Sequence, residues 1–298
     1  MTLKIYADRM SQPSRAVIIF CKVNGIEFEE IKLDIAKRQH HSSEFKEINP
    51  FRQVPAIVDG RFKLFESHAI LRYLACAFPG VADHWYPADL FKRAKIESVL
   101  DWHHSNLRRG AGGINLFIII GINSEARLLP KPDVIGSLLM WMTLTWSLSF
   151  LIDLVFSAAY VLHSTLAPAL GLKKNPQAAA EGEKILSASL EQIESIWLKG
   201  NGRFLLGSFK PSIADLSLVC ELMQLEVVDE KDRDRILGPH KKVKQWIEDT
   251  NQATRPHFDE VHAVLFKLKA KLQLQKQQML EANNKIEYGT KTVLPSKM

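Results

Sequence analysis

The sequence predicts an α/β domain over residues 1–82, followed by an all-helical (all-α) domain over residues 89–275. Three observations predict this fold class. Strand and helix periods alternate near the N-terminus, an Asp-Gly pair separates two β-rich runs, and apolar residues recur at helical spacing further on. A length of 298 residues allows two domains that each bury a core. Residues 276–298 are expected to form a flexible basic tail.

The first part of the chain predicts a strand, a helix and a second strand. Residues 3–7 alternate in the way that is typical of a half-buried strand. Ser11 then supplies a helix cap, a proline follows near the first helical position, and the helix stops before Gly25. Residues 28–33 predict the second strand.

A hairpin and a further helix complete the predicted N-terminal domain. Residues 37–48 are polar and predict a short helix with loops. Residues 54–58 and 62–65 flank Asp59-Gly60, which is one of the strongest hairpin signals in a sequence. Ser67 is predicted to cap the apolar-periodic helix that follows.

Amphipathic helices are predicted in the rest of the chain. One long helical face carries residues spaced three and four apart, namely Ile96, Val99, Leu100, His103 and Leu107. Ser212 and Asp215 form a capping box that opens the apolar run 216–225. Further helices are predicted at 178–197, 241–250 and 258–274.

Charge and cysteine usage exclude some classes of protein. The formal net charge is +6, but residues 267–298 hold seven Lys against Glu281 and Glu287. The charge is therefore a property of the tail, and nucleic-acid binding is not expected. The three cysteines lack pairing or metal-ligand spacing, so neither a disulfide framework nor a metal site is predicted. His103 and His104 are adjacent and point in different directions on a helix, which argues against a shared metal.

Several ordered motifs resemble those of glutathione transferases, most closely the theta class of plants. They are Ser-Gln-Pro-Ser-Arg at 11–15, Asn49-Pro50 before Val54-Pro55, and residues 64–70, 85–87, 93–96 and 211–216. The resemblance covers residues 1–112 and 159–270. It implies a thioredoxin-like glutathione-binding domain, a helical substrate-binding domain, glutathione as co-substrate with no other cofactor, and a homodimer.

Ser11 is the candidate catalytic residue. The glutathione thiol, like a free cysteine, has a pKa of roughly 8.5, so little thiolate is present at neutral pH. A hydroxyl at a helix N-terminus can donate a hydrogen bond to the sulfur in a region of partial positive charge. Similar enzymes use a Ser here, and Gln12 completes this end of the site by similarity. The alternative is that Ser11 only caps the helix, which is worth about 1 kcal/mol.

The resemblance implies further glutathione contacts at two turns. Pro55 resembles the family's cis-proline, which turns the backbone of Val54 outward to pair with the cysteinyl unit. Glu66 is expected to pair with the ammonium of the γ-glutamyl unit, while Ser67 and the free amides of a helix start bind its carboxylate. The alternatives are an ordinary trans proline at a strand start and a routine serine cap.

His40, His41 and Gln53 occupy positions that resemble those binding the glycine carboxylate. The alternative is that the two histidines are merely solvated side chains on a polar surface segment. The second substrate is expected to contact the helix over residues 102–109, with Arg108 or Arg109 lining an apolar cleft.

Residues 114–157 do not resemble the family and interrupt the helical domain. Residues 134–162 form an apolar stretch whose sole charge is Asp153, long enough to span a bilayer. We favour an insertion that is foreign to the fold, such as a translated intervening sequence. The alternatives are an extra helical hairpin on the surface and a membrane anchor, of which the anchor is the less favoured.

The chain ends in Ser296-Lys297-Met298, which is similar to the Ser-Lys-Leu peroxisomal signal. This predicts import into the peroxisome, with a cytosolic or nuclear pool beside it; a chance basic tail is the alternative.

The function implied is the conjugation of reduced glutathione to small hydrophobic electrophiles, together with glutathione-dependent reduction of organic hydroperoxides. A non-catalytic glutathione-binding or interaction module is the alternative, since fold does not fix function. The residues of the predicted glutathione site favour the enzyme, and the insertion at 114–157 favours the module.

Overall fold

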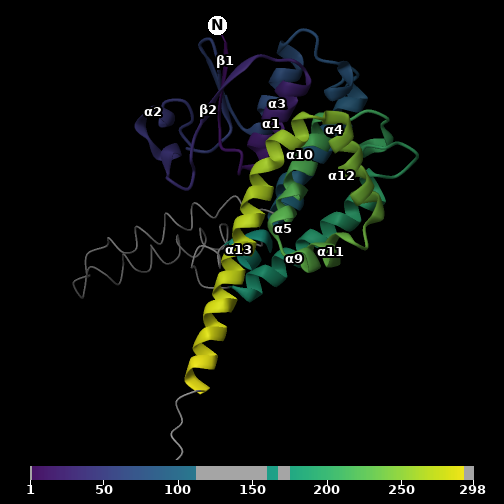
Figure 1. Cartoon of the computed structure of the whole chain (residues 1–298). Coiled ribbons are helices and arrows are strands. Elements are labelled where there is room, and N and C mark those ends of the chain that lie inside the picture. Colours follow the sequence, from purple (N-terminus) through teal and green to yellow (C-terminus); the bar gives the residue numbers. More distant parts are fainter. Residues whose placement is uncertain (1, 112–159, 167–174, 292–298) are drawn as a thin grey trace, which may run out of the picture.

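The computed structural model describes residues 2–111, 160–166 and 175–291 (Figure 1). The insertion at 114–157, most of the apolar stretch at 134–162 and the C-terminal residues 296–298 lie outside the described residues. Within the described ranges, no helix is long and apolar enough to cross a membrane.

The N-terminal domain follows the predicted order of elements. They are β1 (Leu3–Ala7), α1 (Gln12–Val23), β2 (Phe28–Lys32), the 3-10 turn η1 (Gln39–His41), α2 (Ser43–Lys46), β3 (Ala56–Asp59), β4 (Phe62–Phe65) and α3 (Ser67–Ala77). The strands form one mixed sheet in the order β2-β1-β3-β4, in which β1 is parallel to β2 and antiparallel to β3. The predicted hairpin turns at Gly60, whose φ of 59° suits glycine.

The remaining described chain is helical, as predicted. Its elements are η2 (Asp83–Trp85), α4 (Leu90–Ser105), α5 (Leu107–Ala111), the π-helical turn η3 (Leu162–Leu166), α9 (Pro176–Gln192), η4 (Ile193–Trp197), η5 (Leu205–Gly207), α10 (Ile213–Leu222), η6 (Met223–Val227), α11 (Glu230–Leu237), α12 (Lys241–Thr254) and α13 (His257–Lys291). The predicted capping box of Ser212 and Asp215 is present at the start of α10. Asp215 also accepts a hydrogen bond from Trp246 Nε1 at 2.8 Å, so this cap is tied to α12.

Helix α1 joins the two domains. It packs against α3 of its own domain and against α10 and α13 of the helical domain, and its residues from Gln12 to Cys21 are all buried. Phe20 packs edge-on against Trp85, with ring centroids 5.4 Å apart. Buried apolar side chains of both domains form one continuous cluster, so the domains share a core. The start of α1 is therefore fixed by packing on several sides.

One predicted helix is broken in the structure. The face expected from Ile96 to Leu107 is divided, because α4 ends at Ser105 and Asn106 has φ −121° and ψ −85°. The side-chain amide of Asn106 donates to the Trp102 carbonyl oxygen at 3.0 Å. Such local side-chain bonds compete with the helical ladder and favour a helix end.

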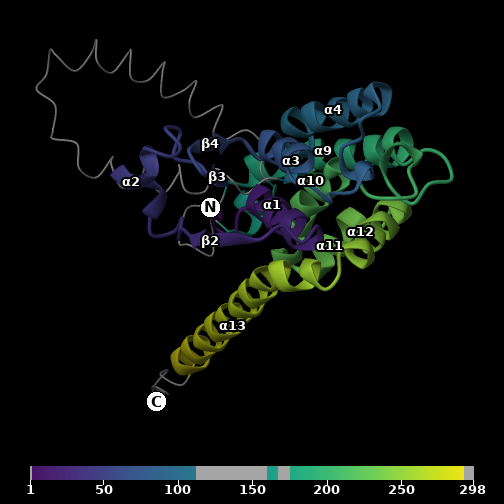
Figure 2. The same cartoon turned by 90° about the horizontal axis from the view of Figure 1, so that it is seen from above.

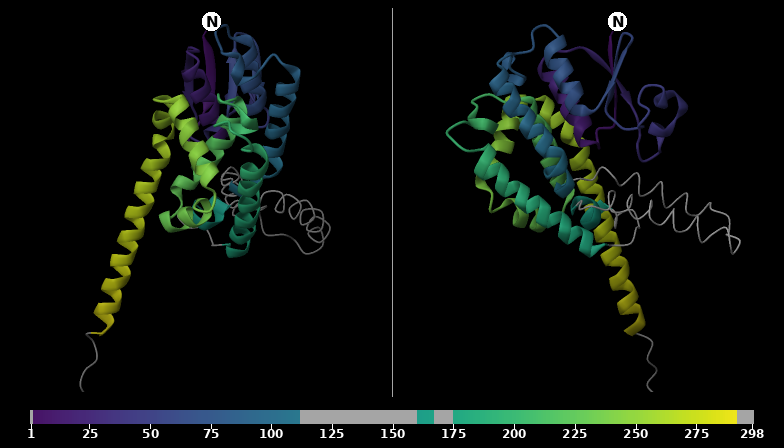
Figure 3. Two further views of the ribbon diagram at one scale, coloured as in Figure 1. Left: turned by 90° about the vertical axis from the view of Figure 1, so that its right-hand side faces the viewer. Right: turned by 180° about the vertical axis from the view of Figure 1, so that it is seen from behind.

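The expectation of a flexible tail from residue 276 is wrong for part of its length, because α13 continues to Lys291. Lys, Gln, Glu, Leu, Met and Ala dominate this segment, and these residues have high helix propensity. Figures 2 and 3 show the second half of α13 extending away from the helical bundle.

Candidate active site

Ser11 is the N-cap residue of α1, but its hydroxyl makes no capping hydrogen bond to the described chain. Pro13 lies in the first turn and has no amide hydrogen, which removes one of the usual donors to a cap. The Ser11 hydroxyl instead donates to the Val54 carbonyl oxygen at 3.5 Å. This bond is long and therefore weak, so a stronger acceptor can replace it. The geometry does not support a role for Ser11 as a simple cap.

The loop that carries Val54 is braced by a buried side chain. The Val54–Pro55 peptide bond is cis, as the resemblance implies. Asn49 is 2% exposed, and its Nδ2 donates to the Gln53 carbonyl oxygen at 2.7 Å. Its Oδ1 accepts from the Phe51 amide at 3.0 Å. A buried side chain that satisfies two backbone groups holds the loop in one conformation, so Val54 has a fixed position opposite the start of α1.

Glu66 is the N-cap of α3 and Ser67 is its first helical residue, so the predicted serine cap is wrong by one position. The chain leaves the helical conformation at Glu66, which adopts φ 70°, so Glu66 takes the cap position. This φ lies outside the extended range of an ordinary cap residue. A non-glycine residue in this region carries strain of about 1–3 kcal/mol, and such strain clusters at ligand sites. The Glu66 side chain is exposed, and it lies beside the unpaired amides of a helix start. A carboxylate and an anion-binding helix end therefore lie together.

The predicted glycine-carboxylate end gathers around η1. His40 is buried, His41 and Gln53 are exposed, and the two imidazole centroids are 4.3 Å apart. Burial, with help from neighbouring cations, lowers the pKa of His40 to about 4, so its imidazole is neutral at pH 7. Arg52 Nη1 lies 3.4 Å from His41 Nδ1. Arg38 and Arg52 are thus cations at this end. The motifs did not predict them, because nothing in the sequence indicates where their side chains lie.

Gln12 is a buried polar residue directly beside Ser11. It is 2% exposed, and its Nε2 has no hydrogen-bond partner among the described residues. Leaving a buried donor unpaired costs about 1–3 kcal/mol. An acceptor on a bound molecule would remove that cost, which agrees with the predicted role of Gln12 in glutathione binding.

Arg15 belongs to the motif at 11–15 and is the most deeply buried cation of α1, with no exposed side-chain surface. Its Nη1 donates to the carbonyl oxygens of Arg9 and Met10 at 2.9 and 3.0 Å. Its Nη2 donates to the Cys220 carbonyl oxygen at 2.9 Å. The turn before Ser11 is therefore anchored to the helical domain. The apolar run that follows Arg15 could have predicted this burial, since an arginine in a buried helix must pair with hydrogen-bond acceptors.

A second buried polar cluster joins α3, α4, α5 and α10. His103 Nδ1 lies 3.3 Å from His68 Nε2, and His103 Nε2 lies 3.3 Å from Glu221 Oε2. Arg108 Nε donates to the same Glu221 oxygen at 3.1 Å. Burial lowers the pKa of both His68 and His103 below the usual range, so both are neutral. The cluster connects the start of α3, where Ser67 lies, to Arg108 of α5.

The two arginines expected near the second substrate differ in environment. Arg108 turns inward to Glu221, whereas Arg109 is exposed. His103 and His104 both place their rings against His68, at centroid distances of 5.3 and 4.3 Å. Over the described ranges, no group of three or more His, Cys, Asp or Glu side chains is placed to hold a metal ion.

Comparison with known proteins decides the family. A model of the glutathione S-transferase N-terminal domain matches residues 1–76, and one of the C-terminal domain matches residues 176–249. Glutathione S-transferase T1 of Arabidopsis thaliana is 60% identical over 269 residues, which covers 90% of this chain and 91% of that relative. This chain belongs to the theta-class glutathione transferases. Both matched ranges fall inside the predicted domains.

Further relatives and solved structures support the same family and fold for this transferase. Glutathione S-transferase T2 of A. thaliana is 57% identical over 277 residues, covering 93% of this chain and 39% of the relative. The apo form of human glutathione S-transferase T1-1 superposes with a TM-score of 0.68 at 29% identity, covering 94% and 98% of the two chains. A human theta-class enzyme in complex with the glutathione conjugate of 1-menaphthyl sulfate gives 0.68 at 26% identity, covering 93% and 92%. The thioredoxin-like domain followed by a helical domain is confirmed, and glutathione is the co-substrate of this enzyme family.

Proposed function

We propose that this transferase conjugates the thiol of reduced glutathione to apolar electrophiles, with Ser11 holding the thiolate. The Ser11 hydroxyl carries the proposal, because it lies at the N-terminus of α1 and, among the described residues, donates only a long 3.5 Å bond to the Val54 carbonyl oxygen. With glutathione paired along the Val54 backbone, this hydroxyl can turn to the sulfur. A hydrogen bond to an ion is about twice as strong as a neutral one, and a helix N-terminus adds roughly 0.3–1 kcal/mol. Both effects lower the pKa of the bound thiol.

The other glutathione groups are assigned by the chemistry of the surrounding side chains. Glu66 pairs with the γ-glutamyl ammonium, while Ser67 and the first amides of α3 bind its carboxylate. Gln12 donates its unpaired amide to the peptide. The glycine carboxylate lies near His40, His41, Arg52 and Gln53.

Two reactions use the same thiolate. With an electrophile, the sulfur attacks the carbon that bears the leaving group, a C–S bond forms, and the leaving group departs with the bonding electron pair. With an organic hydroperoxide, the sulfur attacks the terminal oxygen and the O–O bond breaks to give the alcohol and a sulfenic acid. A second glutathione displaces water from that sulfenic acid, so two thiols are oxidised to a disulfide while one hydroperoxide is reduced to alcohol and water.

Steady-state assays of the purified full chain test both reactions, with chlorodinitrobenzene and cumene hydroperoxide as substrates. Ser11→Ala should lower kcat/KM for both substrates about a hundredfold, whereas Ser195→Ala, an exposed serine of η4, should leave them unchanged. Unchanged turnover in Ser11→Ala would contradict the role of Ser11. Glutathione binding without any turnover by the unaltered chain would support the non-catalytic module instead.

We also propose that the enzyme is a homodimer. Dimers are typical of the family, and Phe51, Leu90 and Phe91 expose large apolar side chains that an interface would cover. Light scattering at micromolar concentration should give twice the chain mass, and the mass of a single chain would contradict the proposal.

For location, the peroxisome remains the proposal, based on the C-terminal Ser-Lys-Met alone. A fluorescent protein fused to the N-terminus should enter peroxisomes and lose that location when these three residues are deleted. An unchanged cytosolic distribution of both forms would contradict it.

A further inference from the structure

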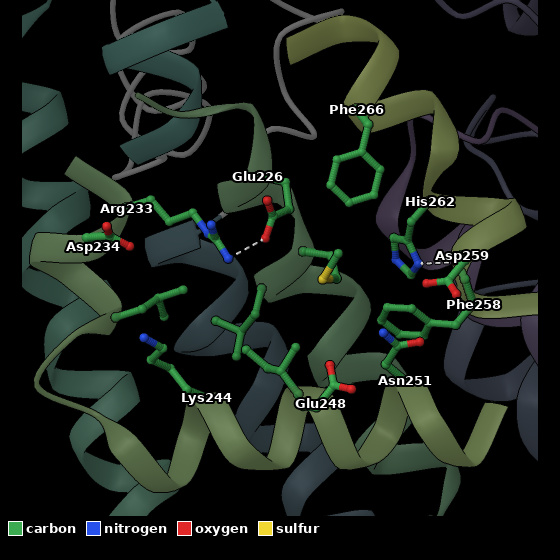
Figure 4. A pocket seen from close by; sticks show the side chains of 14 residues that line it. Glu226, Arg233, Asp234, Lys244, Glu248, Asn251, Phe258, Asp259, His262 and Phe266 are labelled. Atoms are coloured by element: carbon green, nitrogen blue, oxygen red, sulfur yellow. Dashed lines mark hydrogen bonds and ion pairs between the residues drawn. The ribbon is translucent and has the colours of Figure 1, made fainter. Parts of the chain in front are cut away.

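A pocket of about 320 Å³ lies in the helical domain, between η6, α11, α12 and α13 (Figure 4). Its volume is at the lower end of the range for small-molecule sites. The side chains that line it include none of the predicted glutathione-site residues. Leu222, Met223, Ile247 and Phe258 give it an apolar floor. The pocket is therefore separate from the transferase site.

The two ends of this pocket differ in charge. At one end Arg233 pairs with Glu226 at 2.8 Å, and Lys244 and Asp234 lie close by, so positive and negative charges are balanced (Figure 4). The opposite end, the acidic end, carries the carboxylates of Glu248 and Asp259 together with the amide of Asn251.

The carboxylates of the acidic end have different partners. Asp259 pairs with Arg255 at 3.1 Å on the exposed surface, so its charge is partly offset. Glu248 accepts a hydrogen bond from the Gln252 amide at 2.9 Å. This neutral donor leaves the negative charge of Glu248 in place. Glu248 should therefore attract a cation more strongly than Asp259 does.

His262 forms the wall of the acidic end and has no exposed side-chain surface. Its Nδ1 lies 2.9 Å from the Phe258 carbonyl oxygen, and because a carbonyl only accepts, Nδ1 carries the proton. Burial and the nearby Arg15 cation keep the pKa of His262 well below its usual value, so Nε2 holds a lone pair. Nε2 has no hydrogen-bond partner in the described chain. Apart from the Asn251 amide, the acidic end thus presents acceptors.

We propose that this pocket binds a small amphipathic ammonium cation, with its amine at Glu248 and Asp259 and its apolar body against Met223, Phe258 and Phe266. An aromatic face attracts a cation within about 6 Å, and Phe258 and Phe266 both line this pocket. A carboxylate placed here would meet the carboxylates of Glu248 and Asp259 and a histidine lone pair. The acidic end thus favours an ammonium group over a carboxylate, and the proposal does not depend on the proposed transferase chemistry.

Three probes of the same shape test the charge selectivity. Isothermal titration of the purified full chain with naphthylethylammonium should give one saturable site per chain. Naphthylethanol should bind about tenfold more weakly, as expected for the loss of one charge-assisted hydrogen bond, and naphthylacetate should not bind detectably. Equal binding of the acetate would overturn the proposal.

A variant and a competitor locate the binding. Glu248→Gln keeps the shape of the side chain and should weaken ammonium binding about tenfold, while the transferase rate stays unchanged. Glu191→Gln, an exposed acid of α9, is the matched control and should bind as the unaltered chain does. Saturating S-hexylglutathione should not displace the amine. An undiminished affinity in Glu248→Gln, or displacement by S-hexylglutathione, would place the amine elsewhere and overturn the proposal.

Discussion

Arg15 Nη2 donates a hydrogen bond to Gln224 Oε1 at 3.0 Å, which joins α1 to η6 across the two domains. The other amino group of the same guanidinium holds the carbonyl oxygens of Arg9 and Met10, just before Ser11. Burial lowers the pKa of Arg15 to about 10, so the side chain is still a cation at neutral pH. One buried cation therefore fixes the turn that precedes Ser11, the proposed catalytic residue.

Arg15→Met should lower the free energy of unfolding by about 3 kcal/mol, because several buried carbonyl groups lose their donor. Denaturant unfolding measures the change. Arg109→Met, at an exposed arginine of α5, is the control and should stay within about 0.5 kcal/mol of the unaltered chain. Equal free energies of unfolding for the two variants would show that the hydrogen bonds of Arg15 do not stabilise the fold.

The contact between Arg108 and Glu221 predicts non-additive stability. Glu221 is fully buried, and burial raises its carboxyl pKa while Arg108 opposes that rise. Arg108→Leu leaves this carboxyl without its cation and should cost about 3 kcal/mol. The double variant Arg108→Leu/Glu221→Leu should be more stable than Arg108→Leu alone, since it leaves no buried carboxylate without its Arg108 partner. A double-mutant cycle by urea unfolding checks this, and simple additivity would argue against the pairing.

Glu66→Gln should raise the KM for glutathione at least tenfold with little change in melting temperature. The substitution removes the charge that is proposed to pair with the γ-glutamyl ammonium. The side chain is exposed, so the fold loses little stability. Glu47→Gln, an exposed acid at the end of α2, provides the comparison. If the KM values of both variants match that of the unaltered enzyme, Glu66 does not contact glutathione.

His40 predicts a pH dependence of stability. Its pKa is about 4 in the folded chain and about 6.5 when unfolded, so the unfolded state binds more protons between these values. The neutral imidazole therefore stabilises the fold above pH 6.5, and that contribution is lost as the pH falls towards 4. His40→Gln should flatten the fall in unfolding free energy between pH 7 and pH 5. An identical slope in both proteins would indicate that His40 titrates normally.

Local patterns were enough to predict most of the fold. The alternation in β1, the Asp59-Gly60 turn and the capping box of Ser212 and Asp215 all depend on residues close together in sequence. The break at Asn106 could not be predicted in the same way, because an asparagine is compatible with the middle or the end of a helix.

Sequence motifs predicted the residues at the start of α1 and in the Val54 loop as parts of one candidate site. They did not predict the side chains whose partners lie far away in the chain. Ser11, Val54 and Pro55 lie together as expected. Arg15 also has two partners more than 200 residues away in the chain, Cys220 and Gln224, and no local pattern connects it with them. The same holds for Glu221 and its contacts with the first helices of the second domain.

The pKa of the bound glutathione thiol is the most direct test of the proposed mechanism. Thiolate absorbance in the ultraviolet can be titrated with glutathione bound to the unaltered enzyme and to Ser11→Ala. If Ser11 stabilises the thiolate, the pKa lies clearly below the free value of about 8.5 in the unaltered enzyme and returns towards it in Ser11→Ala. Equal thiol pKa values in the two proteins, with glutathione bound to both, would contradict the central role of Ser11.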